Sequence, residues 1–492
     1  MSSKYVISVD QSTQGTKALL FDENANVLLR TDMAHKQIVN EKGWVSHDAE
    51  EIYQNTIAVV KKLIDTSKID KNAVIALGIS NQRETSVIWD RVTGVPLEHA
   101  IVWQCARAIE ICERDEIKKR EAFIQKKTGL NLSPYFPAAK IAWLLENNEV
   151  AGEKAKKHSV CHGTIDSWLV YKLTNGKSYK TDYSNASRTQ LFNIFELKWD
   201  EEICKLFHID VENLPEVVDS DSCFGETTLE GYFDNPVPIC GVAGDSHAAL
   251  FGQGCLEPGM IKATYGTGSS IMMNIGETPL LSKTGVVTSL AWSRKGRAEY
   301  VLEGNLNYTG AVITWLKDDM GMISIPGETE KLANQAVKND DLYIVPAFTG
   351  LGAPYWNSKA RAAVIGMSRT TRRAEFVRAA LECIAYQIAD IIRAMEADSD
   401  ILVQELRVDG GPTKNKYLMQ FQSDILNAKI QIPEAEELSG IGAACMAGIA
   451  VGLWDEEVLK KMHRNEFVPM MDVETRGRHI DGWKQAVDSV LK

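Results

Sequence analysis

Short apolar runs that end in polar turns recur along this chain and predict buried strands. The first run is residues 5–9 (Tyr-Val-Ile-Ser-Val), Asp10 ends it, and apolar residues resume at 17–21 after the polar turn 11–15. Such nearly continuous apolar runs are typical of central strands that are buried on both faces. The pattern therefore predicts a strand–turn–strand unit near the N-terminus, with a carboxylate where its first strand ends.

A second unit of this kind occupies residues 264–275, where Tyr-Gly-Thr-Gly-Ser precedes another apolar run. Glycine-rich turns let backbone N–H groups approach phosphate oxygens without interference from Cβ atoms. Two copies of a strand–phosphate turn–strand unit predict two similar domains that face each other, with ATP between them. The chain contains no GxxxxGK[ST] motif, so a Walker A loop is excluded.

Helical periodicity between the strand patterns predicts an α/β chain. Residues 47–64 form an amphipathic pattern, with Asp48 as the N-cap and Glu51 completing a capping box. Residues 372–397 form a long amphipathic helix, and 439–452 form a helix of small residues. Further buried strands are expected in 73–90, 238–245 and 405–426, and a loop-rich connection in 218–236.

Length and composition narrow the class of protein. The chain has 492 residues, enough for two to four domains, and we expect an N-terminal domain at 1–251 and a C-terminal one at 252–492. The net charge of −12 argues against nucleic acid or an anionic membrane as the main partner. The polar start, the absence of a long apolar run and the nine unpatterned cysteines predict a cytoplasmic protein without membrane insertion.

Asp245 and Asp10 are the candidate reactive carboxylates. Asp245 follows a predicted strand and a glycine, and a carboxylate there can take a proton from an alcohol. Asp10 lies beside a Ser-Thr-Gln-Gly-Thr turn, which suits a Mg²⁺–phosphate site because Mg²⁺ is held by a few carboxylates, water and phosphate oxygens. Each is also compatible with a role as an ordinary turn former.

A pocket for a small polyol or sugar is indicated by polar and aromatic residues in the segment that follows. Arg83 and Glu84 adjoin in a turn between strands and can hydrogen-bond neighbouring hydroxyls. Trp103 and Tyr135 can line the carbon face of the substrate. Individually, the first two are equally compatible with a surface ion pair, and the aromatic residues with core positions.

The chain resembles the FGGY carbohydrate kinases along essentially its whole length, and most of all the glycerol kinases among them. The motifs that carry the resemblance are VDQSTQGTKA, GWVSHD, GISNQRET, AIVWQC, NASRTQLFNI, AGDSHAALFGQ, TYGTGS, VPAFTGLGAPYW, VDGG and MQFQSDIL. The resemblance implies two ribonuclease H-like domains of the actin/Hsp70/sugar-kinase ATPase superfamily around a central cleft. It also implies ATP and Mg²⁺ as cofactors, glycerol as the substrate and a homodimer or homotetramer.

The resemblance also assigns roles to individual residues. Asp245 would be the general base, and Asp10 would help to hold Mg²⁺. Arg83, Glu84, Trp103, Tyr135 and Asp245 would hold the polyol. The nucleotide would be surrounded by Thr13, Gln14, Gly15, Lys17, Thr267, Gly310, Thr314, Gly411 and Asn415.

Two departures from the glycerol kinase pattern leave the substrate open. Ser246 stands where glutamine is usual, and Ser270 stands where phenylalanine is usual. Both changes predict a wider and more polar pocket, so a polyol or ketose of four or five carbons is the alternative substrate. Thr314 also stands where glutamine is common, although backbone groups are expected to keep ATP bound. An Hsp70- or actin-like ATPase is a remote alternative, because it would share the doubled phosphate hairpin.

Overall fold

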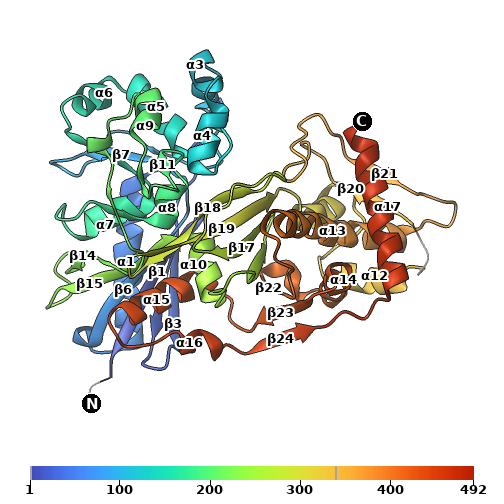
Figure 1. Cartoon of the computed structure of the whole chain (residues 1–492). Coiled ribbons are helices and arrows are strands. Elements are labelled where there is room, and N and C mark those ends of the chain that lie inside the picture. The colour runs from blue at the N-terminus through green and yellow to red at the C-terminus, as the bar shows by residue number, and fades with distance from the viewer. Residues whose placement is uncertain (1–2, 338–340) are drawn as a thin grey trace.

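Two mixed β-sheets organise the chain, one in each half (Figure 1). The computed structural model describes residues 3–337 and 341–492, so the first two residues of the polar start lie outside the described part. The first sheet has the order β14 (Cys223–Thr227), β15 (Val237–Gly244), β6 (Val74–Asn81), β1 (Tyr5–Gln11), β2 (Gly15–Phe21) and β3 (Val27–Ala34). The second has the order β18 (Val287–Arg294), β19 (Arg297–Leu306), β17 (Ser269–Gly276), β16 (Ile261–Tyr265), β22 (Glu405–Asp409), β23 (Lys429–Pro433) and β24 (Arg464–Phe467).

The two sheets share one plan, as the doubled strand–turn–strand pattern predicted. In the first sheet, β1 pairs with β2 and β2 with β3 in antiparallel fashion, and β1, β6 and β15 run parallel. In the second, β16, β17 and β19 form the antiparallel part, and β16, β22 and β23 run parallel. Each glycine-rich turn therefore joins the first two strands of its own sheet.

Helices cover both faces of the first sheet because successive side chains along a strand point to opposite faces. Ile7 on β1 packs in a core with α1 (Ala49–Ser67) and α7 (Ile165–Leu173), whereas Val6 packs in a core with α10 (Asp245–Gly252) and α15 (Leu438–Ala450). The predicted N-cap of α1 is confirmed, since the Asp48 carboxylate accepts hydrogen bonds from the backbone N–H groups of Glu50 and Glu51.

Helices α10 and α15 lie between the two sheets and join the halves. Figure 1 shows the red α15, from near the C-terminus, against the blue strands of the first sheet, where it contacts β1, β6 and β15. Helix α10 reaches the second sheet, because the ring of Phe251 packs edge-on against Trp292 of β18 with 5.2 Å between ring centroids. The division of the chain at residue 251 stays a prediction, since part of the C-terminal segment packs on the N-terminal sheet.

The outer face of the second sheet is covered by three long helices in a continuous apolar core. They are α13 (Arg373–Ser399), α14 (Lys416–Leu426) and α17 (Val473–Leu491). The shorter α11 (Gly310–Thr314) follows β19, α12 (Glu328–Gln335) packs on α13, and α16 (Glu457–Lys460) lies between α15 and β24. No helix in the described part of the chain is long and apolar enough to cross a membrane.

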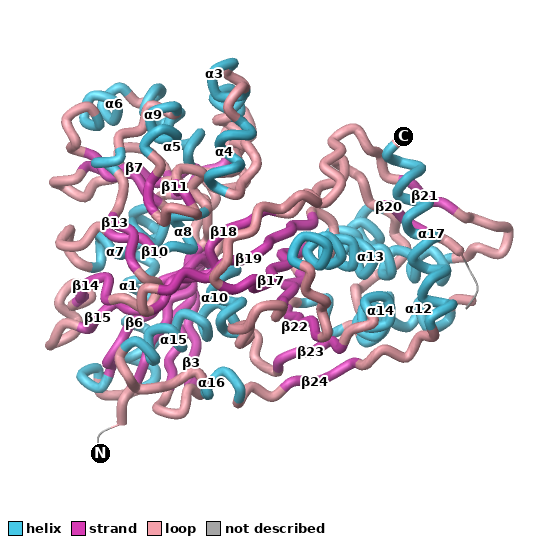
Figure 2. The backbone as a smooth tube through the Cα atoms, viewed as in Figure 1, coloured by secondary structure: helices cyan, strands magenta, loops and turns pink. Residues whose placement is uncertain are grey.

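A group of short elements inserted after β6 forms a separate small core above the first sheet (Figure 2). Its helices are α2 (Ile109–Cys112), α3 (Asp115–Lys118), α4 (Glu121–Thr128), α5 (Pro137–Asn147), α6 (Glu149–Ala155), α8 (Tyr183–Ser187) and α9 (Glu201–Leu206). Its paired strands are β7 (Val87–Asp90) with β9 (Val160–Gly163), and β11 (Phe192–Asn193) with β12 (Lys198–Trp199). The insertion supplies the aromatic residues Trp103 and Tyr135.

Two local expectations were wrong in detail. Strand β1 continues through Asp10 to Gln11 rather than ending before the carboxylate, because β6 supplies parallel partners for both residues. The segment 218–236 contains the edge strand β14, which pairs with β15 although its sequence Cys-Phe-Gly-Glu-Thr has little strand character. The neighbouring strand, rather than local preference, stabilises β14.

Gly78 tests the contact between the halves. A Cβ atom at Gly78 would lie 2.4 Å from the backbone oxygen of Ala443 in α15. We expect Gly78→Ala to lower the free energy of unfolding by about 1–3 kcal/mol, because the backbone of α15 must move away. Chemical denaturation measures the change.

The matched control is Gly477→Ala in α17, where an added Cβ has open space around it. That substitution should stabilise the protein by up to about 1 kcal/mol, because alanine favours a helix interior over glycine. Equal changes in the free energy of unfolding for the two substitutions would show that the backbone of α15 does not pack closely against β6.

Candidate active site

Asp245 lies where β15 ends and α10 begins, and it is the first residue of the helix. Its side chain is 37% exposed, so a ligand can reach the carboxylate. The preceding Gly244 permits close packing, since a Cβ there would lie 2.6 Å from Cγ of Arg83. The backbone N–H of Ser246 donates to Asp245 Oδ1 at 2.6 Å and fixes the orientation of the carboxylate.

Arg83 connects Asp245 to the second half of the chain. Its Nε lies 3.2 Å from Asp245 Oδ1, and its Nη1 and Nη2 donate to the two carboxylate oxygens of Glu303 on β19 at 2.9 and 3.0 Å. This bidentate arrangement is the strong form of a guanidinium–carboxylate contact. The alternative of a surface ion pair between Arg83 and Glu84 is wrong, because both residues are buried and each binds a different partner.

Glu84 binds Arg188, which closes a buried network of charges. Arg188 Nε donates to Glu84 Oε1 at 2.6 Å, and its Nη1 lies 2.9 Å from Glu303 Oε2. Burial by itself would raise the pKa of Glu303, but the guanidinium groups of Arg188 and Arg83 outweigh burial and hold this pKa well below its usual range. Glu303 is therefore charged and joins the two arginines.

The aromatic side chains Trp103 and Tyr135 form one wall beside this network. Their ring centroids are 5.6 Å apart, and Trp103 Nε1 donates to Thr13 Oγ1 at 2.9 Å. The expected polyol wall and the first glycine-rich turn are therefore in direct contact. The fully buried Lys140 donates to the backbone oxygen of Tyr135, and burial lowers the pKa of Lys140 to about 7, although Glu84 opposes the shift.

Asp10 and Lys17 lie side by side on β1 and β2. Ser80 Oγ donates to Asp10 Oδ1 at 3.0 Å, and Lys17 Nζ lies 3.9 Å from Asp10 Oδ2. Lys17 also forms an ion pair of 2.7 Å with Glu437, which precedes α15. Burial raises the pKa of Asp10 to about 6, Lys17 opposes this shift, and the charge of Asp245 adds to it. Asp10 and Asp245 are therefore close enough to repel each other.

The two glycine-rich turns have separate surroundings. In the first turn, Gln14 is exposed, and a Cβ at Gly15 would lie 2.6 Å from the backbone oxygen of Met33. In the second turn, Thr267 is exposed, and its backbone oxygen accepts from the N–H of Ala311 in α11. Gly310 opens that helix, and a Cβ there would lie 2.6 Å from the oxygen of Gly266, so glycine allows the turn and helix to meet.

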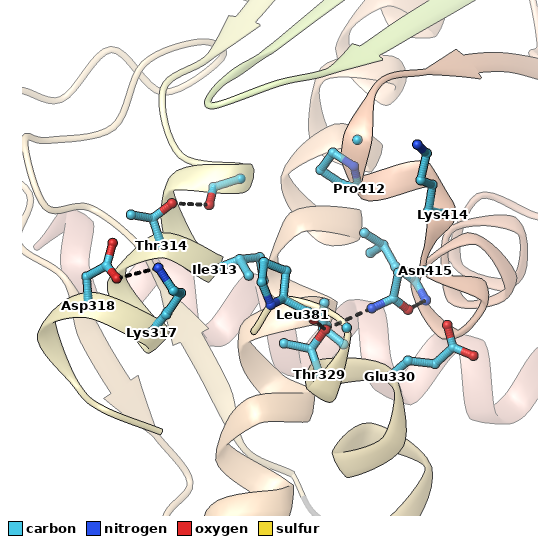
Figure 3. Close-up of a pocket in the computed structure, with 15 residues that line it drawn as sticks. Ile313, Thr314, Lys317, Asp318, Thr329, Glu330, Leu381, Pro412, Lys414 and Asn415 are labelled. Carbon is cyan, nitrogen blue, oxygen red and sulfur yellow. Dashed lines mark hydrogen bonds and ion pairs between the residues drawn. The ribbon is translucent and has the colours of Figure 1, made fainter. Parts of the chain in front are cut away.

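A cavity of about 460 Å³ lies beside α11 (Figure 3). The predicted nucleotide residues Gly310, Thr314, Gly411 and Asn415 all line it. Its walls are apolar at Ile313, Leu381, Pro412 and Leu418, which suits a flat heteroaromatic ring. Asn415 caps α14 through Oδ1 and donates from Nδ2 to Thr329 Oγ1, as the dashed lines in Figure 3 show.

The structure thus brings the predicted residues together in two groups. Arg83, Glu84, Trp103, Tyr135 and Asp245 meet around the charge network, with Asp10 close by. The residues that line the 460 Å³ cavity in the described chain all come from the second half, so Thr13, Gln14, Gly15 and Lys17 lie outside its wall.

Ser246 and Ser270 are both half-buried. Ser270 pairs across β17 and β19 with Asn305, which donates to Glu303.

Family models match both halves of the chain. The model of the N-terminal domain of the FGGY family of carbohydrate kinases matches residues 5–252, and that of its C-terminal domain matches residues 261–451. The chain belongs to the FGGY family of carbohydrate kinases. The family decides against the Hsp70- or actin-like alternative, and the chain is a phosphotransferase of the carbohydrate kinase type.

Full-length relatives and solved structures agree with this membership. The chain is 48% identical to glycerol kinase 1 of Thermotoga maritima and 44% identical to glycerol kinase of Staphylococcus haemolyticus, over 98–99% of each chain. It is also similar to Plasmodium falciparum glycerol kinase with ADP, at 37% identity and a TM-score of 0.94 over 99–100% of each chain. Xylulose kinase of Lactobacillus acidophilus, at 21% identity and a TM-score of 0.89 over 98–99%, shares the fold. The predicted two-domain sugar-kinase fold is confirmed.

Four charged residues of the site were not among the sequence-based candidates. They are Lys140, Arg188, Glu303 and Glu437. Arg188 lies in the motif NASRTQLFNI, which carries the family resemblance, and Lys140 follows the candidate Tyr135 by five positions. Glu303 directly follows the apolar run Tyr-Val-Leu, and a charged residue at the end of such a run is a signal that indicates a buried partner.

The charge network predicts a large effect of Glu303→Gln. The substitution keeps the shape of the side chain but removes the charge between two buried guanidinium groups, so we expect a loss of about 3–5 kcal/mol in the free energy of unfolding. The pKa of Glu303 lies below its unfolded value, so its contribution is present at neutral pH and lost as the pH falls through the acidic range. The difference between the two proteins should therefore shrink in acid.

The control is Glu277→Gln, since Glu277 and its partner Arg297 are exposed and 4.0 Å apart. Loss of this ion pair should change the free energy of unfolding by less than about 1 kcal/mol. Urea denaturation of both variants across a pH series provides the comparison. A pH-independent loss in Glu303→Gln would show that the charge of Glu303 is not what holds the network.

Proposed function

We propose that this chain transfers the terminal phosphoryl group of ATP to a primary hydroxyl of glycerol, with Asp245 as the general base. The observation that carries the proposal is the half-exposed Asp245 carboxylate held by Arg83 at the head of α10, beside the Trp103–Tyr135 wall. The names of the full-length relatives support glycerol as the acceptor, and the ADP in the Plasmodium structure's name supports an adenine nucleotide as the donor.

In this proposal, the residues of the site position the reactants. Glu84 and Arg83 bind neighbouring hydroxyls of the polyol, and the aromatic wall packs against its carbon face. Asp245 accepts the proton of the attacking hydroxyl, which raises the nucleophilicity of that oxygen. Little covalent chemistry is required of the protein, because phosphoryl transfer depends chiefly on alignment and on neutralisation of charge.

The nucleotide would lie between the two glycine-rich turns. The cavity lined by Gly310, Thr314, Gly411 and Asn415 would hold the adenine, and the turn at Thr267 would lead from it to the phosphates. The turn with Thr13, Gln14 and Gly15, together with Lys17, would approach the phosphates from the first half of the chain.

Mg²⁺ fits beside Asp10. No group of three or more histidine, cysteine, aspartate or glutamate side chains in residues 3–337 and 341–492 could form a protein-only metal cage. Mg²⁺ bound to nucleotide needs only one or two carboxylates in addition to phosphate and water. Asp10 would supply one of these carboxylates. Burial and the charge of Asp245 both disfavour the ionised form of Asp10, and a bound cation would favour it. The metal would neutralise phosphate charge.

A substrate longer than glycerol is the second candidate. Ser270 Oγ is buried and has no hydrogen-bond partner among the described residues. A buried polar atom without a partner is costly, and a further hydroxyl on a four- or five-carbon polyol or ketose would satisfy it. This candidate keeps the same reaction and the same base.

Activity measurements with a series of acceptors test the main proposal. ADP release with Mg-ATP should have its highest kcat/KM with glycerol, compared with erythritol, xylitol, ribitol, xylulose and ribulose. Asp245→Asn should lower kcat by about 10²–10⁴-fold, because the hydroxyl loses its general base. Asp481→Asn on the surface of α17 is the control and should leave kcat unchanged. Full activity of Asp245→Asn would show that Asp245 is not the general base.

Ser270→Ala separates the two candidate substrates. If Ser270 binds a hydroxyl that glycerol lacks, the substitution should lower kcat/KM for the longer acceptors by roughly tenfold, the equivalent of one hydrogen bond, and leave the value for glycerol unchanged. Ser270→Phe should then reject the longer acceptors by roughly 10–200-fold relative to glycerol, because it fills the space. Parallel losses for all acceptors would exclude a role of Ser270 in substrate selection.

A further inference from the structure

Two cysteines face each other on neighbouring strands of the first sheet, outside the site described above. Cys223 on β14 is the cross-strand partner of Cys240 on β15 in the antiparallel register. In a regular antiparallel ladder, directly opposed residues have Cα atoms about 4.5–5.5 Å apart, which lies within the range of about 4.4–6.8 Å found across disulfide bonds. The ladder shifts register between this pair and the next one, Gly225 with Ile239. The Cys223 thiol is close enough to Cys240 to raise the pKa of the Cys240 thiol.

The two thiols differ in accessibility. Cys223 is exposed, and the other eight cysteines of the described chain are buried. Burial raises the pKa of Cys240 to about 12, and the adjacent Cys223 adds to the shift, so Cys240 is a protonated thiol at neutral pH. Cys223 is therefore the thiol that meets a reagent from solvent, and Cys240 is placed to react with Cys223 afterwards.

A cavity next to Cys223 offers room for a small reagent. Cys223 lines a space of about 520 Å³ together with Lys177, Lys180, Glu216 and Glu226. Lys180 Nζ donates to the backbone oxygen of Cys223 at 3.4 Å, which places a positive charge beside the exposed cysteine. A mixture of cationic and anionic side chains suits a small zwitterionic peptide that carries both charges.

We propose that Cys223 and Cys240 form a redox-active pair, which a low-molecular-weight peptide disulfide such as glutathione disulfide converts into a cross-strand disulfide. The Cys223 thiolate attacks one sulfur of the reagent, forms a mixed disulfide and releases one thiolate. Cys240 loses its proton to solvent and attacks Cys223 Sγ, which forms the Cys223–Cys240 bond and releases the second thiolate. Two protein thiols are oxidised, and one small disulfide is reduced to two thiols.

The bond would tie the edge strand β14 to the strand that carries Asp245. Strand β15 runs from Val237 through Cys240 to Gly244, directly before the base. Strand β14 has no partner on its other side in the described sheet, so β15 is what holds it in place. The disulfide would thus stabilise the sheet edge without contributing an atom to the site.

The test treats the fully reduced, full-length protein with glutathione disulfide at mildly alkaline pH, followed by alkylation under denaturing conditions, thiol counting and peptide mass spectrometry. The nine thiols of the wild type should fall by two, and one cross-linked peptide pair should contain Cys223 and Cys240. Cys240→Ser should stop at a glutathione adduct on Cys223. Cys223→Ser should leave Cys240 unmodified, and its kinase activity should match that of the wild type.

Cys383→Ser is the matched control, because Cys383 is a buried thiol of α13 in the apolar core of the second sheet, and it should form the same cross-link. Dithiothreitol should restore both thiols. A stable glutathione adduct on Cys223 in the wild type, equal in yield to that in Cys240→Ser, would overturn the proposal. So would full alkylation of Cys223 after treatment, or a cross-link that joins other cysteines.

Discussion

The buried ion pair between Arg83 and Glu303 is the contact on which the site depends. Arg83 comes from the first half of the chain and Glu303 from the second, and both are almost fully removed from solvent. Removal of charges from water is costly, and the cost is offset only where geometry is good and further partners complete the hydrogen bonding. Arg188 and Asn305 supply those partners for Glu303. Arg83 can then hold Asp245 in a defined place.

The packing of α10 against α15 fixes the position of Asp245 beside this ion pair. A Cβ atom at Gly442 of α15 would lie 1.8 Å from the backbone oxygen of Ala248, and one at Gly252 would lie 2.4 Å from that of Leu438. The two helices are thus in backbone contact, which only glycine allows at these points. Since α10 begins at Asp245, the small residues of α15, which come from the far end of the sequence, fix the position of this carboxylate. Helix packing and charge pairing therefore act on the same residue.

Sequence reasoning predicted the parts of the fold whose causes are local. The β1–β2 hairpin, the cap at Asp48 and the strand before Asp245 follow from short-range patterns, and the structure contains all three. It could not predict that Glu84 points away from Arg83, because Glu84 has a left-handed backbone with φ of 59° that depends on its partner Arg188, about a hundred positions further along the chain. Glu303 was missed for the same reason, since only the folded chain brings Arg83 and Arg188 to it.

The distribution of charge around Asp10 and Asp245 supports the proposal that this carbohydrate kinase uses a divalent cation. The charge network combines Glu84, Glu303 and Asp245 with only two guanidinium groups, and it therefore carries an excess of negative charge. Asp10 lies near enough to Asp245 for the two to repel, and Lys17 is already paired with Glu437. Lys262 is a further buried cation whose charge acts on Asp245 and Glu303, and a polyphosphate brought to these carboxylates would add repulsion to the site. In the proposed reaction, a divalent ion held by Asp10 would reduce this repulsion, and Asp245 would remain free to act as the base.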